Sequence, residues 1–303
     1  MMHGVNVSMQ ITGGKFVAFL GIVASAILTV SSLGATIRDD EPDSAYLALG
    51  ALADFASVGT FVNSWGYTGC GILIAPDWVL TAAHLLTAAS SATFTIGGTA
   101  YTSTQLFTDP SWDGNASDGS DFGLVHLSSS LTAIPPPSLY SGSSLLGQTC
   151  TFVGYGFTGT GLTGWKTLDG QKRGFQNVVD VNNANFGNPA FVFGATFDNP
   201  HLTNSTALPL EGCVAPGDSG GGVFVMDGSQ YYLAGVISFV ASTNGSANSS
   251  YGNISGFDSL SAAMPWIDTI VPEPSVSTLA LGGGLAALCF QRWKKGRDGT
   301  ESL

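Results

Sequence analysis

The stretch Cys213–Gly222 reads CVAPGDSGGG and places Ser219 among four glycines. A simple turn needs only one or two glycines, at the positions that require a positive φ. Gly217 can turn its own N–H group and that of Ser219 towards one point, and Gly220 and Gly221 allow another chain to come close. A serine is a nucleophile once a neighbouring base takes its proton, and the two N–H groups could stabilise the negative charge that develops during the attack. A plain glycine-rich turn is the alternative.

Two other segments could supply the base and an acid that orients it. His84 ends the stretch WVLTAAH, whose alanines let the ring lie against a neighbouring backbone. Asp121 begins the alternating run DFGLVHL, where an acid is costly unless it is paired. Alone, His84 reads as a structural histidine and Asp121 as a solvated turn residue. His126 has no fixed relation to Asp121 along a strand, and His201 follows Asn-Pro in a predicted loop.

Taken together, TAAH, DFGLV and GDSGG occur in an order that resembles the trypsin- and chymotrypsin-like serine proteases, over about residues 69–266. The resemblance implies that His84 is the general base, that Asp121 orients it, and that Ser219 is the nucleophile. It also implies an oxyanion hole made by the N–H groups of Gly217 and Ser219. The expected activity is hydrolysis of peptide bonds in protein or peptide substrates through an acyl-enzyme.

The same resemblance assigns the substrate-binding residues. LAGVISF ends at Phe239 and matches the strand whose serine, Ser238, and following aromatic residue line the substrate cleft. Cys213 falls at the floor of the primary pocket, where trypsins carry an acid, so no preference for Lys or Arg is implied. Val240 would narrow the entrance. We therefore expect substrates with small or medium apolar side chains.

The fold class is predicted to be all-β. Short apolar or alternating runs recur between turn residues from 55 to 258, which indicates a barrel or a sandwich. Asp-Gly within residues 226–230 predicts a hairpin, and SLSAAMPWIDTIV at residues 259–271 predicts one packed helix. The resemblance implies two six-stranded antiparallel β-barrels, the second of which opens at Gly-Tyr-Gly, residues 154–156.

The expected domain order follows from these features. Three prolines within residues 133–147 exclude a central strand and predict a linker there. The N-terminal barrel, with His84 and Asp121, then spans residues 36–132. The C-terminal barrel and its helix, with Ser219, span residues 148–270.

The N-terminus reads as a secretory signal. Lys15 precedes the apolar run Phe16–Ala35, which contains small residues before a cut predicted after Ala35. Residues 1–35 are therefore the expected signal peptide, removed by signal peptidase. A buried helix or a membrane anchor is the alternative, and the acidic segment IRDDEPDS that follows argues against a core helix.

The C-terminal residues 271–303 resemble a PEP-CTERM sorting tail of exopolysaccharide-producing Gram-negative bacteria. They contain Val-Pro-Glu-Pro, an apolar run at residues 276–290 and the basic cluster QRWKKGR. The resemblance implies a transmembrane segment at 276–290, processing by an exosortase, export across the inner membrane, and display at the cell surface or release after transient anchoring. An ordinary tail anchor is the alternative.

Charge and cysteine content exclude several classes of function. Residues 36–271 carry four basic and eighteen acidic side chains, so they have no electrostatic reason to bind nucleic acid, and we expect membrane contact only through the terminal segments. No Cys-x-x-Cys pair occurs, so we expect no metal and no other cofactor. A disulfide between Cys150 and Cys213 is a hypothesis.

Two questions stay open at this level. The main interpretation is a secreted or surface-presented serine endopeptidase, and the alternatives are a catalytically silent surface binding protein on the same fold or an esterase. Many relatives become active only when cleavage exposes an apolar N-terminus that pairs with the Asp before the nucleophile. Asp218 is present here, but no Ile-Val-Gly-Gly start precedes it. We therefore expect an enzyme without a conventional propeptide, active once its signal is removed.

Overall fold

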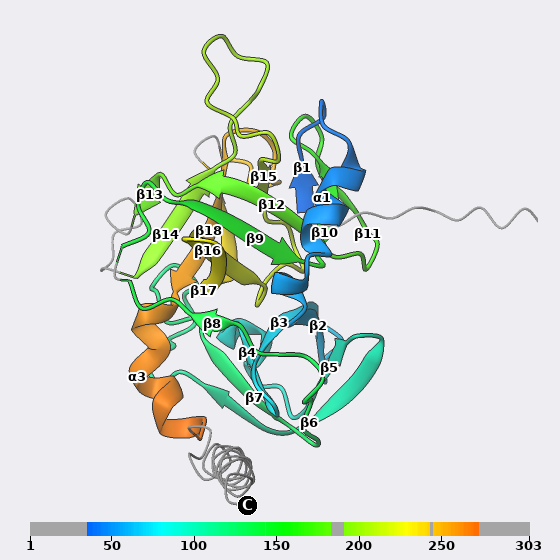
Figure 1. The fold of residues 1–303 in the computed structure, drawn as a ribbon, viewed down its shortest axis with the longest axis vertical. Helices are drawn as coiled ribbons and strands as arrows, with labels where there is room; N and C mark the ends of the chain where they lie inside the picture. Colours follow the sequence, from blue (N-terminus) through cyan, green and yellow to red (C-terminus); the bar gives the residue numbers. More distant parts are fainter. Residues whose placement is uncertain (1–34, 143, 183–190, 243–244, 273–303) are drawn as a thin grey trace, which may run out of the picture. The chain divides into compact units, whose positions relative to one another are not determined.

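The computed structural model describes residues 35–142, 144–182, 191–242 and 245–272 (Figure 1). The predicted signal peptide, apart from Ala35, and the predicted sorting tail, apart from Val271 and Pro272, lie outside these residues. Within them, no helix combines the length and the apolar character needed to cross a membrane.

The first half of the chain forms a closed six-stranded antiparallel barrel, as predicted. Its strand order is β2-β3-β4-β7-β6-β5, and pairing of β5 with β2 closes it (Figure 1). The phenylalanines Phe61, Phe94 and Phe122 are fully buried in its core. The strands are β2 (Val58–Asn63), β3 (Thr68–Ala75), β4 (Trp78–Thr81), β5 (Ala92–Ile96), β6 (Thr99–Thr108) and β7 (Gly123–Leu127).

The second half corrects the expectation of another closed six-stranded barrel. Its main sheet is open, with the order β12-β9-β16-β17-β18-β14-β13, while β8 pairs with β17. The edge strand β12 does not pair with β14, and its Gln176 N–H donates to Leu210 O, at 2.8 Å, outside that sheet. The strands are β8 (Ser138–Leu139), β9 (Thr149–Gly154), β12 (Arg173–Val178), β13 (Val181–Asn182), β14 (Val192–Thr196), β16 (Gly222–Asp227), β17 (Gln230–Ser242) and β18 (Asn253–Ser259).

A third, four-stranded sheet has the order β11-β10-β1-β15. Its strands are β1 (Ala35–Ile37), β10 (Phe157–Thr160), β11 (Gly164–Leu168) and β15 (Gly212–Cys213). Strand β1 runs parallel to β10 and antiparallel to β15, so the start of the described chain is part of the folded body. The first residue of this strand, Ala35, lies within the predicted signal peptide.

Two short helical segments after β1 were not predicted. They are α1 (Asp43–Gly50) and the 3-10 helix η1 (Ala53–Phe55). The guanidinium of Arg173 in β12 is fully buried and donates to both carboxylate oxygens of Asp43, at 2.6 and 2.9 Å. The same guanidinium donates a third hydrogen bond, of 2.9 Å, to Oδ2 of Asp169. This partly buried pairing joins α1 to β12, and partners 130 residues apart leave no local pattern in the sequence.

The predicted hairpin and the predicted C-terminal helix are both confirmed. Strands β16 and β17 pair Asp227 with Gln230, and Gly228 at their turn has a φ of +62°. The helix α3 (Leu260–Ile270) lies inside the predicted range and buries Leu260, Ala263 and Ile267 against the core. The candidate site residues lie in the connections after β4, before β7, and between β15 and β16.

Candidate active site

His84 and Asp121 contact each other in the first barrel. His84 lies in the 3-10 helix η2 (Ala83–Leu85) that follows β4, and Asp121 lies just before β7. The Oδ2 atom of Asp121 is 2.6 Å from Nδ1 of His84, and its Oδ1 atom accepts the main-chain N–H of His84 at 2.8 Å. The Asp121 side chain is fully buried, whereas about a third of the His84 side chain is exposed. The buried carboxylate thus fixes both the ring and the backbone of a histidine whose outer edge can meet another group.

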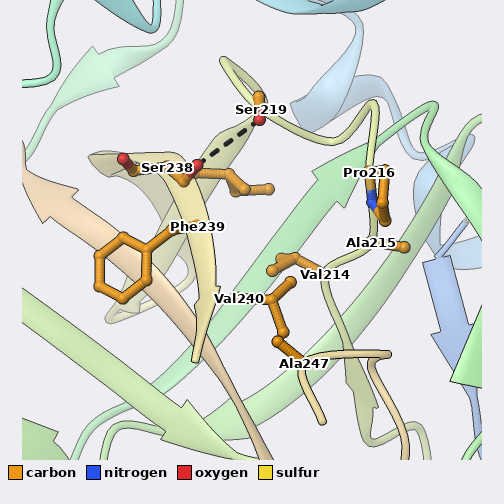
Figure 2. A pocket seen from close by; sticks show the side chains of 9 residues that line it. Val214, Ala215, Pro216, Ser219, Ser238, Phe239, Val240 and Ala247 are labelled. Carbon is orange, nitrogen blue, oxygen red and sulfur yellow. Dashed lines mark hydrogen bonds between the residues drawn. The ribbon is translucent and has the colours of Figure 1, made fainter. Parts of the chain in front are cut away.

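Ser238 of β17 connects this pair to Ser219. Its Oγ atom donates to Oδ2 of Asp121 at 2.5 Å. Its carbonyl oxygen lies 3.5 Å from Oγ of Ser219, the contact drawn as a dashed line in Figure 2. In this geometry Ser219 Oγ bonds to Ser238 rather than to His84. A rotation of the Ser219 side chain is needed to bring its hydroxyl to the imidazole, and such bonds commonly tighten only when substrate binds.

The loop around Ser219 leaves two N–H groups unpaired. The N–H groups of Asp218, Gly220 and Gly221 donate to main-chain carbonyl oxygens at 2.8 to 3.0 Å. Those of Gly217 and Ser219 have no acceptor among the described residues. Gly217 has a φ of +90° and Gly220 a φ of +80°, conformations that favour glycine. One unpaired N–H group therefore lies on each side of Asp218 in the sequence. Two such donors are suited to binding an anionic oxygen.

The glycine after Ser219 permits a close contact between the two halves. A Cβ atom on Gly220 would lie 2.2 Å from Cys70 O and 2.3 Å from Thr81 Oγ1. Beside it, the Cys70 N–H of β3 donates to Ser219 O at 2.7 Å. The loop that carries Ser219 is therefore held directly against the barrel that carries His84.

Asp218 is buried beneath this loop, with an exposed fraction of 1%. Its carboxylate accepts the N–H groups of Gly156 at 2.7 Å and Ala215 at 2.9 Å, and no ion pair to it is present in the described part of the chain. Burial raises its pKa to about 7, although both N–H bonds act to lower it. Gly156 belongs to the predicted Gly-Tyr-Gly turn, and a Cβ there would meet the Asp218 carboxyl carbon at 2.6 Å.

A cavity of about 240 Å³ opens beside Ser219. Figure 2 shows Val240 pointing towards Val214 and Ala247, whereas the ring of Phe239 points away from them. Three short apolar side chains thus meet at one end of the cavity. Its lining consists of Val214, Ala215, Pro216, Ser219, Ile237, Ser238, Phe239, Val240 and Ala247.

The structure shows where Cys213 lies and overturns one hypothesis about the cysteines. Cys213 is fully buried in β15, opposite Thr36, and does not line the cavity, because the next residue, Val214, forms the wall instead. Cys213 and Cys150 are both free thiols, so the hypothesised disulfide between them is wrong. They lie in different sheets, Cys150 being paired with Val225 of β16.

The two other described histidines lie elsewhere. His126 is 2.6 Å from Thr104 Oγ1 through Nδ1, and His201 is 3.0 Å from Asp39 through Nε2. Sequence reasoning missed Asp258, whose Oδ2 accepts the Asp121 N–H at 2.8 Å. The only sequence signal for Asp258 was that it is the single acidic residue in the run NISGFDS, residues 253–259. No group of three or more His, Cys, Asp or Glu side chains in the described part of the chain is placed to hold a metal ion.

Comparisons with known proteins agree with this geometry. The family model described as Trypsin matches residues 54–267. Chymotrypsin-like elastase family member 1 of Rattus norvegicus is 27% identical over 230 residues, which cover 69% of this chain and 80% of that protein. The protein of the same name from Bos taurus is 29% identical over 227 residues, with the same coverage of both chains.

Proposed function

Because this chain belongs to the trypsin family of serine proteases, we propose that it is an endopeptidase that cleaves peptide bonds through an acyl-enzyme on Ser219. The observation that carries the proposal is the pair of unpaired N–H groups, on Gly217 and Ser219, next to the bonded pair of His84 and Asp121. A glycine-rich turn that served only as a connection would have no reason to leave two donors free beside a serine hydroxyl.

The proposed reaction forms an acyl-enzyme and then releases it, and the same groups act in both stages. Ser219 Oγ turns to Nε2 of His84, loses its proton to the ring and attacks the carbonyl carbon of the scissile bond. The N–H groups of Gly217 and Ser219 bind the oxyanion. His84 then passes the proton to the leaving amine, and a water molecule releases the acyl group by the same steps. Asp121 keeps the proton of the neutral ring on Nδ1, so Nε2 is free to accept.

We propose a preference for small or medium apolar side chains at the residue before the scissile bond. The support comes from the end of the cavity, where the apolar side chains of Val214, Val240 and Ala247 lie, and from the lack of a charged side chain in its lining (Figure 2). Cleavage of a peptide library by the mature chain, with a Ser219→Ala variant as control, tests activity and preference together. Cleavage that persists in the variant would contradict the proposal.

A catalytically silent binding protein is the second candidate. The observation in its favour is that Ser219 Oγ contacts Ser238 O rather than His84. If the hydroxyl stayed there, the serine would lack a base and the cavity could still hold an apolar side chain. An esterase would use the same groups as the endopeptidase, and short ester substrates beside peptides distinguish the two activities.

We also propose that removal of the signal peptide activates the enzyme. Strand β1 begins near the residues that hold Asp218. Its Ala35 pairs with Thr158 of β10, and two residues before Thr158 lies Gly156, one donor to the carboxylate. On the other side, the register of β1 along β15 leads towards Ala215, the second donor. An amino group at the start of β1 would therefore lie near a buried carboxyl group that makes no ion pair within the described part of the chain.

The backbone of Ala35 supports a cut directly before it. Ala35 has a φ of +59°, which costs a residue with a side chain about 1–2 kcal/mol. A free amino group has no φ, so cleavage after Gly34 removes this strain. Ser32 and Gly34 also place small residues at the positions that signal peptidase reads. A cut after Ala35, as the sequence first indicated, would remove the first residue of β1.

Export and sorting remain proposals that the sequence of the two ends supports. We propose that the chain crosses the inner membrane of a Gram-negative bacterium and is then held transiently through residues 276–290 until an exosortase processes the tail. Intact-mass measurement of the cell-surface form tests this. A mass that includes residues 276–303 in the final product would contradict processing of the tail.

A further inference from the structure

Asp258 is a buried acid directly behind Asp121. It lies in β18, paired with Val236 of β17 and Val192 of β14, and it is fully buried. Its Oδ2 atom accepts the main-chain N–H of Asp121 at 2.8 Å. Its Oδ1 atom has no hydrogen-bond partner in the described part of the chain. Burial of an acid is costly, and the hydrogen bond of the Asp258 side chain is made to the main chain of Asp121, the residue proposed to orient His84.

The two neighbouring acids are supplied with donors unequally. Asp121 accepts three hydrogen bonds, from the N–H and the ring of His84 and from the hydroxyl of Ser238. Asp258 accepts one. Burial raises the pKa of Asp258 well above its usual range, the bond from the Asp121 N–H lowers it, and the charges of Asp121 and Asp118 raise it further. The raised pKa favours the uncharged form of Asp258, whose carboxyl group has one donor, whereas the carboxylate of Asp121 has three donors.

We propose that Asp258 is a positioning residue of the reaction, whose carboxyl group fixes the main chain of Asp121 and so aims the Asp121 carboxylate at His84. The inference rests on the proposed function, because it has meaning only if His84 and Asp121 act on Ser219. In its uncharged form, Asp258 offers an acceptor to the N–H group without placing a second negative charge beside Asp121.

The location of Asp121 makes such an anchor necessary. The residue precedes β7 and lies outside the strand pairing of the barrel, which begins at Gly123. Its own carbonyl oxygen accepts only a long bond, of 3.2 Å, from the Ala83 N–H. A displacement of a catalytic group by about 1 Å can reduce the rate by about 10²-fold. Loss of the Asp258 acceptor would leave the Asp121 N–H buried and unpaired, so the segment would shift to find another partner.

The test compares variants of the mature chain in kcat, KM and melting temperature. Asp258→Asn keeps a carbonyl oxygen and cannot ionise, so we expect a kcat within about 3-fold of the wild type. Asp258→Ala removes the acceptor, and we expect kcat to fall about 10- to 100-fold while KM changes by less than about 3-fold. Asn253→Ala is the matched control, because Asn253 is in the same strand, equally buried, and also has an unpartnered side-chain oxygen. It should lower the melting temperature and leave kcat unchanged.

Several results would overturn the inference. One is a folded Asp258→Ala variant that keeps the wild-type kcat, and another is an equal loss of kcat in Asn253→Ala. If Asp258→Ala does not fold, Asp258→Leu fills the space without an acceptor, and the same loss of kcat is expected. An Asp258→Asn variant as impaired as Asp258→Ala would show that a charged carboxylate is required. Failure of the proposed function looks different, because the wild type itself would then cleave no peptide.

Discussion

The Oγ atom of Ser238 donates to Oδ2 of Asp121 at 2.5 Å, and the carbonyl oxygen of the same serine contacts the Ser219 hydroxyl at 3.5 Å. One residue of β17 therefore contacts both the acid of the first barrel and the serine of the second half. Its neighbours Phe239 and Val240 line the cavity, so the strand that lines this cavity also joins the proposed catalytic residues.

Replacement of the orienting acid tests the proposed role of the dyad. Asp121→Asn preserves the shape of the side chain but presents an N–H donor to Nδ1 of His84. The ring then carries its proton on Nε2 and cannot accept one from Ser219. We expect kcat on a peptide substrate to fall by about 10⁴-fold. Circular dichroism should show an unchanged fold, and a variant with near wild-type kcat would contradict the role given to Asp121.

Enlargement of the cavity tests the specificity proposal. Val240→Gly removes the side chain that points towards Val214 and Ala247 (Figure 2). We expect kcat/KM for substrates with Phe before the scissile bond to rise at least about 10-fold relative to those with Ala, the scale on which pocket volume discriminates. Profiling with a peptide library measures the ratio. The same preference in both proteins would place the primary pocket elsewhere.

The three described cysteines provide a chemical test of the fold. Cys70, Cys150 and Cys213 are buried free thiols, and burial raises the pKa of each. We expect no alkylation of these residues in the native protein at neutral pH, because the thiolate is the reacting form. In denaturant without reductant, intact mass should show all three modified. A product with only one modified would restore the bridge between Cys150 and Cys213.

The start of the mature chain should control the pH dependence of stability. A folded pKa of about 7 for Asp218, against 3.8 in the unfolded chain, means that the folded state holds this proton more tightly. Stability therefore falls as pH rises from about 4 to about 7, by roughly 4 kcal/mol from this group. An ammonium group on Ala35 would lower that pKa, so the fall should be smaller in a chain that starts at Ala35 than in one that starts at Gly34.

Urea unfolding at pH 4.5 and 7.5 measures this difference. Glu211, whose pKa burial raises to about 7, contributes a similar fall to both chains and cancels in the comparison. Asp218→Asn should abolish the difference between the two chains. Equal pH dependence in the unsubstituted chains would argue against contact between the amino group of Ala35 and Asp218.

The sequence predicted the elements that depend on local patterns. The β-strands of the first half, the hairpin at residues 226–230 and the helix at 259–271 follow from alternation, an Asp-Gly turn and apolar spacing, whereas closure of the first barrel was implied by the family resemblance. The structure also brings His84 and Asp121, which lie 37 residues apart, into contact. Their catalytic roles, and that of Ser219, stay predictions that the experiments above address.

What could not be predicted depends on contacts between distant segments. Strand β1 is three residues long and is recognisable only from its pairing with β10 and β15. Helix α1 depends on the buried pair of Arg173 and Asp43. Asp258 became visible as a neighbour of Asp121 only when β18 was placed beside β17. The open second sheet is likewise visible only from the strand pairing, in which β12 and β14 are not partners.

The most direct test of the central claim is labelling of the mature chain with a fluorophosphonate probe, beside a Ser219→Ala variant and a His84→Ala variant. An activated serine attacks the phosphorus, whereas an ordinary hydroxyl does not. We predict stoichiometric labelling of the wild type, none of Ser219→Ala, and at most slow labelling of His84→Ala. A folded wild-type chain that starts at Ala35 and takes up no probe would contradict the account and favour the silent binding protein.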